Sequence, residues 1–174
     1  MPFNYLTTLR IGMAQTFHLR LLLEGRDDLV YEVRKPEAER LKRILAGEDW
    51  SEQIFWFDTI DGRSVLVNLA YLQGVRYLWD AAMAPPDSRI STDEDMRIAL
   101  LGREVLSESP SEDPRDVYTL FWELELGLDK ATFTDVDGED FTLIARQIVY
   151  LTAPKQVVDE GRRQVESEDG LEEP

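Results

Sequence analysis

Two pairs of aspartates stand beside similar turns, and they are the residues best suited by type and spacing to acid–base chemistry. Asp58 and Asp61 border one turn, and Asp135 and Asp137 border the other. Paired carboxylates can divide the roles of general acid and general base when burial sets their pKa values apart. Turns of this kind are expected to be exposed, where carboxylates provide little acid–base power. We therefore predict that the protein is not an enzyme and has no catalytic residues.

The second of these turns, residues 135–140 (DVDGED), is acidic enough to suggest calcium binding. Its spacing does not suit that role. An EF-hand loop with Gly138 at its sixth position would need carboxylates at positions one and twelve, which are Phe133 and Ile144. We interpret the run as a hairpin turn with solvated acids and predict no metal site.

The sequence offers few other reactive side chains. It has no cysteine, which excludes thiolate nucleophiles and the usual zinc and iron–sulfur ligand sets. His18 is the only histidine, and it falls on the polar face of a predicted strand, where the sequence places no orienting partner. Neither a serine-nucleophile elbow nor a glycine-rich phosphate loop occurs. We expect no cofactor.

A cluster of basic residues surrounds a predicted helix near residue 40. Acidic Glu37 and Glu39 interleave with it, and the net charge of −16 repels phosphate backbones at long range. We interpret the cluster as a solvated helix face. The alternative function is a nucleic-acid-associated small-barrel protein that uses these cations. The members of the basic cluster are Arg34, Lys35, Arg40, Lys42 and Arg43.

The charge is distributed unevenly along the chain. Residues 1–80 carry 10 basic and 12 acidic side chains, whereas residues 81–174 carry 9 basic and 23 acidic ones. An excess of acids favours solubility and basic protein partners over nucleic acids and anionic lipid.

Large aromatic side chains exceed what the predicted helices and strands need for one core. Tyr118 and Trp122 lie on a helix whose apolar residues cover more than one face, and Trp56 and Trp79 lie on strands expected to have one solvated side. Aromatic residues concentrate in protein interfaces. These four residues form the candidate interaction surface, and we expect the partner to be another protein or a second copy in a homodimer.

The strongest structural pattern is the stretch from Ile54 to Asp80. Two apolar runs, 55–60 and 64–69, are separated by Asp61-Gly62, a dipeptide that favours a tight hairpin turn. A further strand is predicted over residues 75–79, although 69–83 also fits a helix. The inward-facing residues of the hairpin are predicted to be Phe55, Phe57, Val65 and Val67.

The preceding residues predict another hairpin and a helix. Residues 16–24 alternate, with Phe17, Leu19, Leu21 and Leu23 on one face, and residues 29–34 form the returning strand. Pro36 suits the first turn of a helix that ends near Gly47.

The second half of the chain repeats the pattern of the first at offsets of 74 to 79 residues. Gly25-Arg26 recurs as Gly102-Arg103, and Asp61-Gly62 recurs as Asp137-Gly138. A second helix begins at Asp113-Pro114, whereas residues 92–102 fit a helix or a strand when considered alone and a strand by comparison with the first half. We predict an α+β fold of two tandem similar units. Each is a β-rich antiparallel sheet or partly closed small barrel with one helix, and a pseudo-two-fold axis relates them.

The predicted units, about 16–80 and 96–154, are each too small to be stable alone, so we expect one compact body over 1–154. A Pro-Pro pair marks a linker at 81–95, and residues 155–174 are predicted to be an acidic disordered tail. The chain has neither a signal-peptide pattern nor an apolar run long enough to span a bilayer. The sequence therefore predicts a non-enzymatic cytoplasmic protein-interaction or assembly module.

Overall fold

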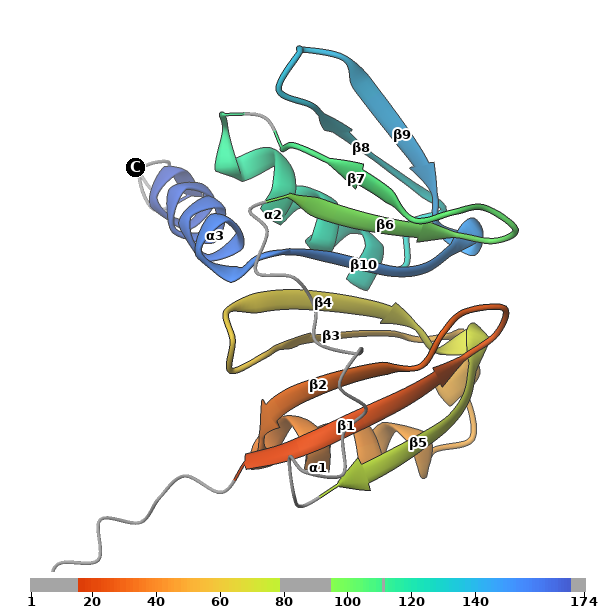
Figure 1. The fold of residues 1–174 in the computed structure, drawn as a ribbon. Coiled ribbons are helices and arrows are strands. Elements are labelled where there is room, and N and C mark those ends of the chain that lie inside the picture. Colours follow the sequence, from red (N-terminus) through yellow and green to blue (C-terminus); the bar gives the residue numbers. More distant parts are fainter. Residues whose placement is uncertain (1–15, 79–94, 111, 170–174) are drawn as a thin grey trace, which may run out of the picture.

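The computed structural model describes residues 16–78, 95–110 and 112–169, which are drawn in colour in Figure 1. The fold is α+β with mostly antiparallel sheets, as the sequence predicts. The described residues that precede residue 79 are called the first half below, and those that follow residue 94 are called the second half.

The first half contains two β-hairpins with a helix between them and a final strand. Short 3₁₀ helices precede the second hairpin and the final strand. The elements are β1 (Thr16–Leu23), β2 (Leu29–Arg34), α1 (Lys35–Leu45), η1 (Trp50–Glu52), β3 (Ile54–Asp58), β4 (Arg63–Asn68), η2 (Leu69–Tyr71) and β5 (Leu72–Leu78).

The second half also contains two hairpins with a helix between them, and it ends in a strand followed by a further helix. The elements are β6 (Met96–Leu100), β7 (Leu106–Glu108), α2 (Pro114–Glu125), β8 (Lys130–Thr134), β9 (Asp140–Ile144), η5 (Ala145–Gln147), β10 (Ile148–Pro154) and α3 (Lys155–Asp169). The strand interpretation of the two ambiguous segments is confirmed for the parts that form β5 and β6, whereas residues 69–71 form η2 and residues 79–83 and 92–94 lie outside the described residues.

Both predicted Asp-Gly turns close hairpins. Gly62 has a φ of 89° and Gly138 a φ of 81°, a region of backbone space that glycine enters without steric cost. In the second turn the Asp135 carboxylate accepts the backbone N–H groups of Asp137 and Glu139 at 2.9 and 2.8 Å. This carboxylate therefore stabilises the turn itself, as expected for an aspartate in a turn.

A five-stranded sheet joins the halves in the order β3-β4-β10-β6-β7. Its central pair is antiparallel β4 and β10, which lie side by side where the two halves meet in Figure 1. The first half also has the sheet β2-β1-β5, and the second half has the two-stranded sheet β8-β9. None of these sheets closes into a barrel within the described residues, so of the two predicted forms the antiparallel sheet is the one observed. The chain instead builds open sheets because β4 pairs with a strand of the other half.

The central sheet is buried on both faces because alternate side chains enter two different cores. On β4, Val65 and Val67 pack in the core of the first half, whereas Leu66 packs in that of the second. On β3, Phe55 and Phe57 are buried as predicted, and Trp56 points to the opposite core. A strand with one solvated side was the expectation, and it fails here because α2 and α3 cover the second face.

The two predicted helices form, and each buries an apolar stripe. On α1 the stripe includes Ala38 and Leu41. Helix α2 begins after Asp113, whose carboxylate accepts the N–H of Arg115 at 3.0 Å and caps the helix. The buried residues of α2 are Val117, Leu120, Phe121 and Leu124.

The segment predicted to be a disordered tail instead forms α3 over residues 155–169. Two small contacts explain the difference. Val158 is fully buried in the second core, and Gly161 lies so close to the start of α2 that an added Cβ would overlap the Pro114 carbonyl group. At its first turn Lys155 forms an ion pair with Asp58 at 3.3 Å. Packing thus stabilises a segment whose composition alone suggests disorder.

A candidate ligand pocket between the two halves

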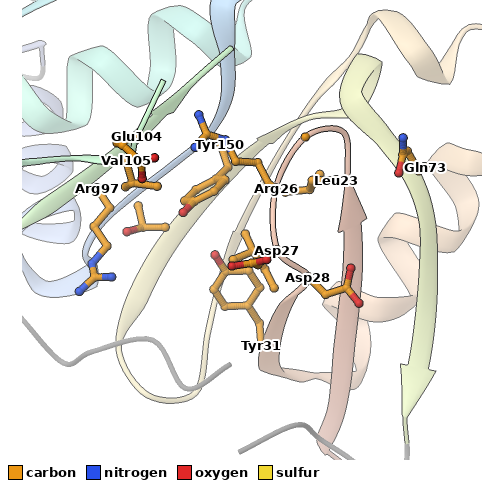
Figure 2. Close-up of a pocket in the computed structure, with 13 residues that line it drawn as sticks. Leu23, Arg26, Asp27, Asp28, Tyr31, Gln73, Arg97, Glu104, Val105 and Tyr150 are labelled. Atoms are coloured by element: carbon orange, nitrogen blue, oxygen red, sulfur yellow. The ribbon is translucent and has the colours of Figure 1, made fainter. Parts of the chain in front are cut away.

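A hollow lies where the β1–β2 turn of the first half faces β6 and β10 of the second half (Figure 2). Its volume is about 670 Å³, within the range of about 300 to 1,000 Å³ that is typical of small-molecule sites. Its lining is mainly polar. The residues are Leu23, Gly25, Arg26, Asp27, Asp28, Leu29, Tyr31, Gln73, Arg97, Glu104, Val105, Tyr150 and Thr152.

Tyr31 is the most unusual residue of this pocket. Its side chain belongs to β2, it is only 2% exposed, and its hydroxyl finds no hydrogen-bond partner among the residues that the structure describes. Burial, reinforced by the neighbouring Tyr150, raises the pKa of the Tyr31 phenol well above its usual value. The hydroxyl therefore stays protonated at neutral pH and is available as a donor.

Tyr150 and Thr152 reach the same hollow from β10. Figure 2 shows the hydroxyl ends of Tyr31 and Tyr150 directed toward its middle, from opposite halves of the protein. Burial raises the pKa of Tyr150 as well. Thr152 is fully buried, and its hydroxyl oxygen accepts a hydrogen bond from Arg63 at 2.8 Å. The pocket thus brings together three hydroxyl groups.

Charged groups surround these hydroxyls. The positive charges of Arg63 and Arg97 act on Tyr31, and those of Arg26 and Arg97 act on Tyr150, in each case opposing the rise in pKa that burial causes. Arg26 also donates to the backbone carbonyl of Leu100, so it links the β1–β2 turn to the second half.

The acids of the pocket lie in the turn and beside β7. Asp28 is paired with Arg20, with the carboxylate 2.6 Å from the guanidinium. Asp27 and Glu104 are exposed. The surroundings are therefore mixed in sign, and a carboxylate acts on each phenol beside the cations, Asp61 on Tyr31 and Asp27 on Tyr150.

The predicted basic cluster is spread around α1. Arg40 donates to Glu37 at 2.9 Å and to the backbone carbonyl of Trp56, and its guanidinium lies 4.7 Å from the centre of the Phe55 ring. Lys35 forms an ion pair with Glu39 at 3.6 Å, and the Lys42 ammonium stands 4.4 Å from the centre of the Tyr77 ring. Arg34 and Arg43 are exposed. Three of the five cations therefore have partners within the first half.

Of the residues predicted to form the interaction surface, some are exposed and some are buried. Trp122 is 42% exposed and stacks on Tyr118 with ring centres 6.1 Å apart. Trp56 is 8% exposed, and it packs on Phe121 beneath the guanidinium of Arg162. The structure thus places three of the four residues around α2. The fourth, Trp79, lies outside the described residues, as does the predicted linker up to residue 94.

The remaining sequence candidates form no common site. His18 is partly buried, and its Nδ1 atom has no partner within the described part of the chain. At the first turn Asp58 accepts a hydrogen bond from Ser64 at 2.7 Å, and Asp61 accepts one from Thr59. Over residues 16–78, 95–110 and 112–169, no three histidine, cysteine or acidic side chains gather as metal ligands would. No helix in those ranges is long and apolar enough to cross a membrane.

Fold and pocket together define an α+β protein with antiparallel sheets and a polar, hydroxyl-lined hollow between its halves. Comparison with known proteins adds no relative. No protein-family model matches the chain, and no curated protein or solved structure is significantly similar to it.

Sequence reasoning missed the pocket because its residues come from both halves. Tyr31 lies on the strand that the sequence predicts over residues 29–34, and a buried tyrosine normally needs a hydrogen-bond partner. This need for a hydrogen-bond partner at Tyr31 was the one signal in the sequence that could have indicated the pocket. It could not indicate Tyr150 and Thr152, which reach the site through the pairing of β10 with β4.

Proposed function

We propose that the protein is a non-enzymatic cytoplasmic assembly module that binds further copies of itself through the edges of β5 and β9. One observation carries the proposal. β4 of the first half pairs with β10 of the second, whereas β9 and β5, the strands in the corresponding places, pair only with β8 and β1 within the described residues. Among the described strands the contact that joins the halves is thus made once, and the two corresponding edges have no partner strand there.

The correspondence between the halves is supported by backbone hydrogen bonds that recur at offsets of 76 or 77 residues. They include bonds in the hairpin turns and bonds that connect one hairpin to the next. These repeated bonds favour two tandem similar units. In each of the following pairs the first bond lies in the first half and the second is its counterpart: Gly62 N to Thr59 O with Gly138 N to Asp135 O; Ile60 N to Glu32 O with Val136 N to Ser109 O; Leu69 N to Gln53 O with Ala145 N to Asp129 O; Glu24 N to Tyr71 O with Leu101 N to Gln147 O.

A two-fold relation between such units would pair β9 with β5 in the same way as β4 with β10. The described strands lack that second pairing, so they give no support to the predicted pseudo-two-fold axis. The contact is instead of the head-to-tail kind, which repeats from chain to chain unless a rotation closes it into a ring. Open strand edges present unpaired N–H and C=O groups that can add a strand from another chain.

The main test blocks one edge without disturbing the hairpin that carries it. Because Asp135 N donates to Glu139 O, the alternation of an antiparallel ladder leaves the backbone of Thr142 facing away from β8. Thr142→Pro therefore removes an outward N–H group and spares the β8–β9 backbone hydrogen bonds. It does remove the hydrogen bond between the Thr142 and Thr132 hydroxyls, which the Thr132→Pro control removes equally. We expect light scattering to show a mass that rises with concentration for the wild-type chain and a monomer for the variant.

Two controls make the test specific. Thr132→Pro removes the outward N–H group of the paired residue on β8, so it should associate like the wild type. Thr142→Pro keeps its β5 edge and should cap wild-type assemblies when the two are mixed, which lowers their mass. Circular dichroism establishes that both variants are folded. A wild-type chain that stays monomeric at every concentration would refute the proposal.

A further inference from the structure

We propose that the hollow between the β1–β2 turn and β10 binds a small molecule through a carboxylate or phosphate group, which accepts hydrogen bonds from the hydroxyls of Tyr31, Tyr150 and Thr152. This ligand site is separate from the strand edges of the proposed assembly. It depends on the side chains that the two halves bring together in Figure 2.

The unpartnered hydroxyl of Tyr31 is the first reason. Nearly all buried polar side-chain atoms in proteins have a hydrogen-bond partner, and each exception needs an explanation. Tyr31 is almost fully buried, lines the hollow, and has no partner for its hydroxyl within the described residues. A bound group that accepts its hydrogen would supply the missing partner.

The second reason is that the neighbouring hydroxyls are also placed to donate. The Thr152 oxygen already accepts a hydrogen bond from Arg63, and a hydroxyl that accepts from an arginine can still donate its own hydrogen to a different group. The Tyr31 and Tyr150 phenols are protonated at neutral pH, and burial raises their pKa values further. Several donors converging on one space suit an oxygen-rich acceptor group better than a donor group such as an amine.

Charge indicates that this acceptor is anionic. Arg26 and Arg97 line the hollow. Two guanidinium groups act on each phenol, Arg63 and Arg97 on Tyr31 and Arg26 and Arg97 on Tyr150, against one carboxylate each, Asp61 on Tyr31 and Asp27 on Tyr150. Hydrogen bonds from such donors to an ionised acceptor are about twice as strong as those between neutral groups. A carboxylate and a phosphate share this chemistry.

The size and the exposed acids restrict the ligand to a small molecule. A volume of about 670 Å³ accommodates a compact metabolite. Asp27 and Glu104, which line the hollow and are exposed, would repel an extended polyanion such as a nucleic acid. The same acids can pair with a cationic group at the far end of the ligand.

The test measures the binding of two simple probes, inorganic phosphate and succinate, by calorimetry and by the rise in unfolding temperature. Sodium chloride at matched ionic strength shows what screening alone contributes. The Thr142→Pro chain is used alongside the wild type, so that association of the chains cannot imitate binding. We expect at least one probe to bind, and the stronger one identifies the preferred acid group.

Removal of single hydroxyls locates the site. Tyr31→Phe and Thr152→Val should each weaken binding about tenfold, the loss of one good hydrogen bond. Tyr118→Phe, on α2 and outside the hollow, should bind like the wild type. Tyr31→Phe should fold at least as stably as the wild type without a probe, because it removes an unpartnered buried hydroxyl. The proposal is overturned if neither probe exceeds chloride, or if Tyr31→Phe binds the probes unchanged.

Discussion

Leu66 of β4 lies directly opposite Leu151 of β10, and both side chains are fully buried in the core of the second half. Leu66 nonetheless belongs to a strand of the first half. Its sequence neighbours on both sides, Val65 and Val67, pack in the first core. The joint between the halves is therefore a shared sheet with a core on each face, and the two halves should unfold together.

Leu66→Ala tests this coupling. Truncation of a fully buried leucine typically costs about 2 to 5 kcal/mol, and here the cavity opens at the joint itself. We expect one cooperative denaturant transition, shifted to lower concentration, with fluorescence and circular dichroism coinciding. Leu128→Ala, at a position 47% exposed, should change stability by no more than about 0.5 kcal/mol. Two separate transitions would show that the halves fold independently.

Gly161→Ala should destabilise the protein although alanine is the better helix former. In an exposed helix the exchange would gain about 1 kcal/mol. Here the new Cβ would overlap the Pro114 carbonyl group and approach the Tyr118 Cβ to 2.8 Å, so α3 must move away from α2. We expect a net loss of about 1 to 3 kcal/mol by chemical denaturation. Glu166→Ala, on an exposed part of α3, should be nearly neutral, and a more stable Gly161→Ala chain would contradict the close packing.

The elements that could be predicted are those whose cause is local. The Asp61-Gly62 turn follows from the backbone freedom of glycine, and the buried stripe of α2 follows from the spacing of its apolar residues. The start of α2 follows from the Asp113 cap. None of these features depends on which strand lies next to which.

The features that sequence could not supply depend on contacts between distant segments. Trp56 is buried because α2 covers the second face of its sheet, and α3 is ordered because Gly161 allows a close approach to α2. Tyr31 and Tyr150 share a hollow only because β4 pairs with β10. A single sequence indicates which side chains share a face of a strand, but it does not indicate which strands pair. The candidate site lies where two strands distant in sequence, β4 and β10, pair.

The cap of α2 should contribute both a hydrogen bond and a charge effect. Asp113→Ala removes the acceptor for the Arg115 N–H group and should cost about 1 kcal/mol, whereas Asp113→Asn keeps an acceptor and should cost less. Hydrogen bonds from Arg115 lower the pKa of Asp113, so its stabilising effect is present above about pH 4 and is lost as pH falls through the folded-state pKa. The stability difference between wild type and Asp113→Ala should therefore shrink in acid, and a difference that is constant with pH would argue against the charge effect.

Alkaline solution should destabilise the protein through Tyr31. Burial raises the pKa of its phenol well above the value near 10 that it has in the unfolded chain, so unfolding releases a proton once the pH exceeds about 10. The stabilisation is fully present below that pH and is lost as pH rises toward the folded-state pKa, by up to about 1.4 kcal/mol per pH unit. Denaturant unfolding measured from pH 8 to 11 should therefore show a shallower loss for Tyr31→Phe than for the wild type. The raised pKa of Tyr150 remains in that variant, so only the share due to Tyr31 should disappear. Equal slopes for the two chains would mean that the Tyr31 phenol reaches solvent, and they would remove the main support for a ligand as its missing partner.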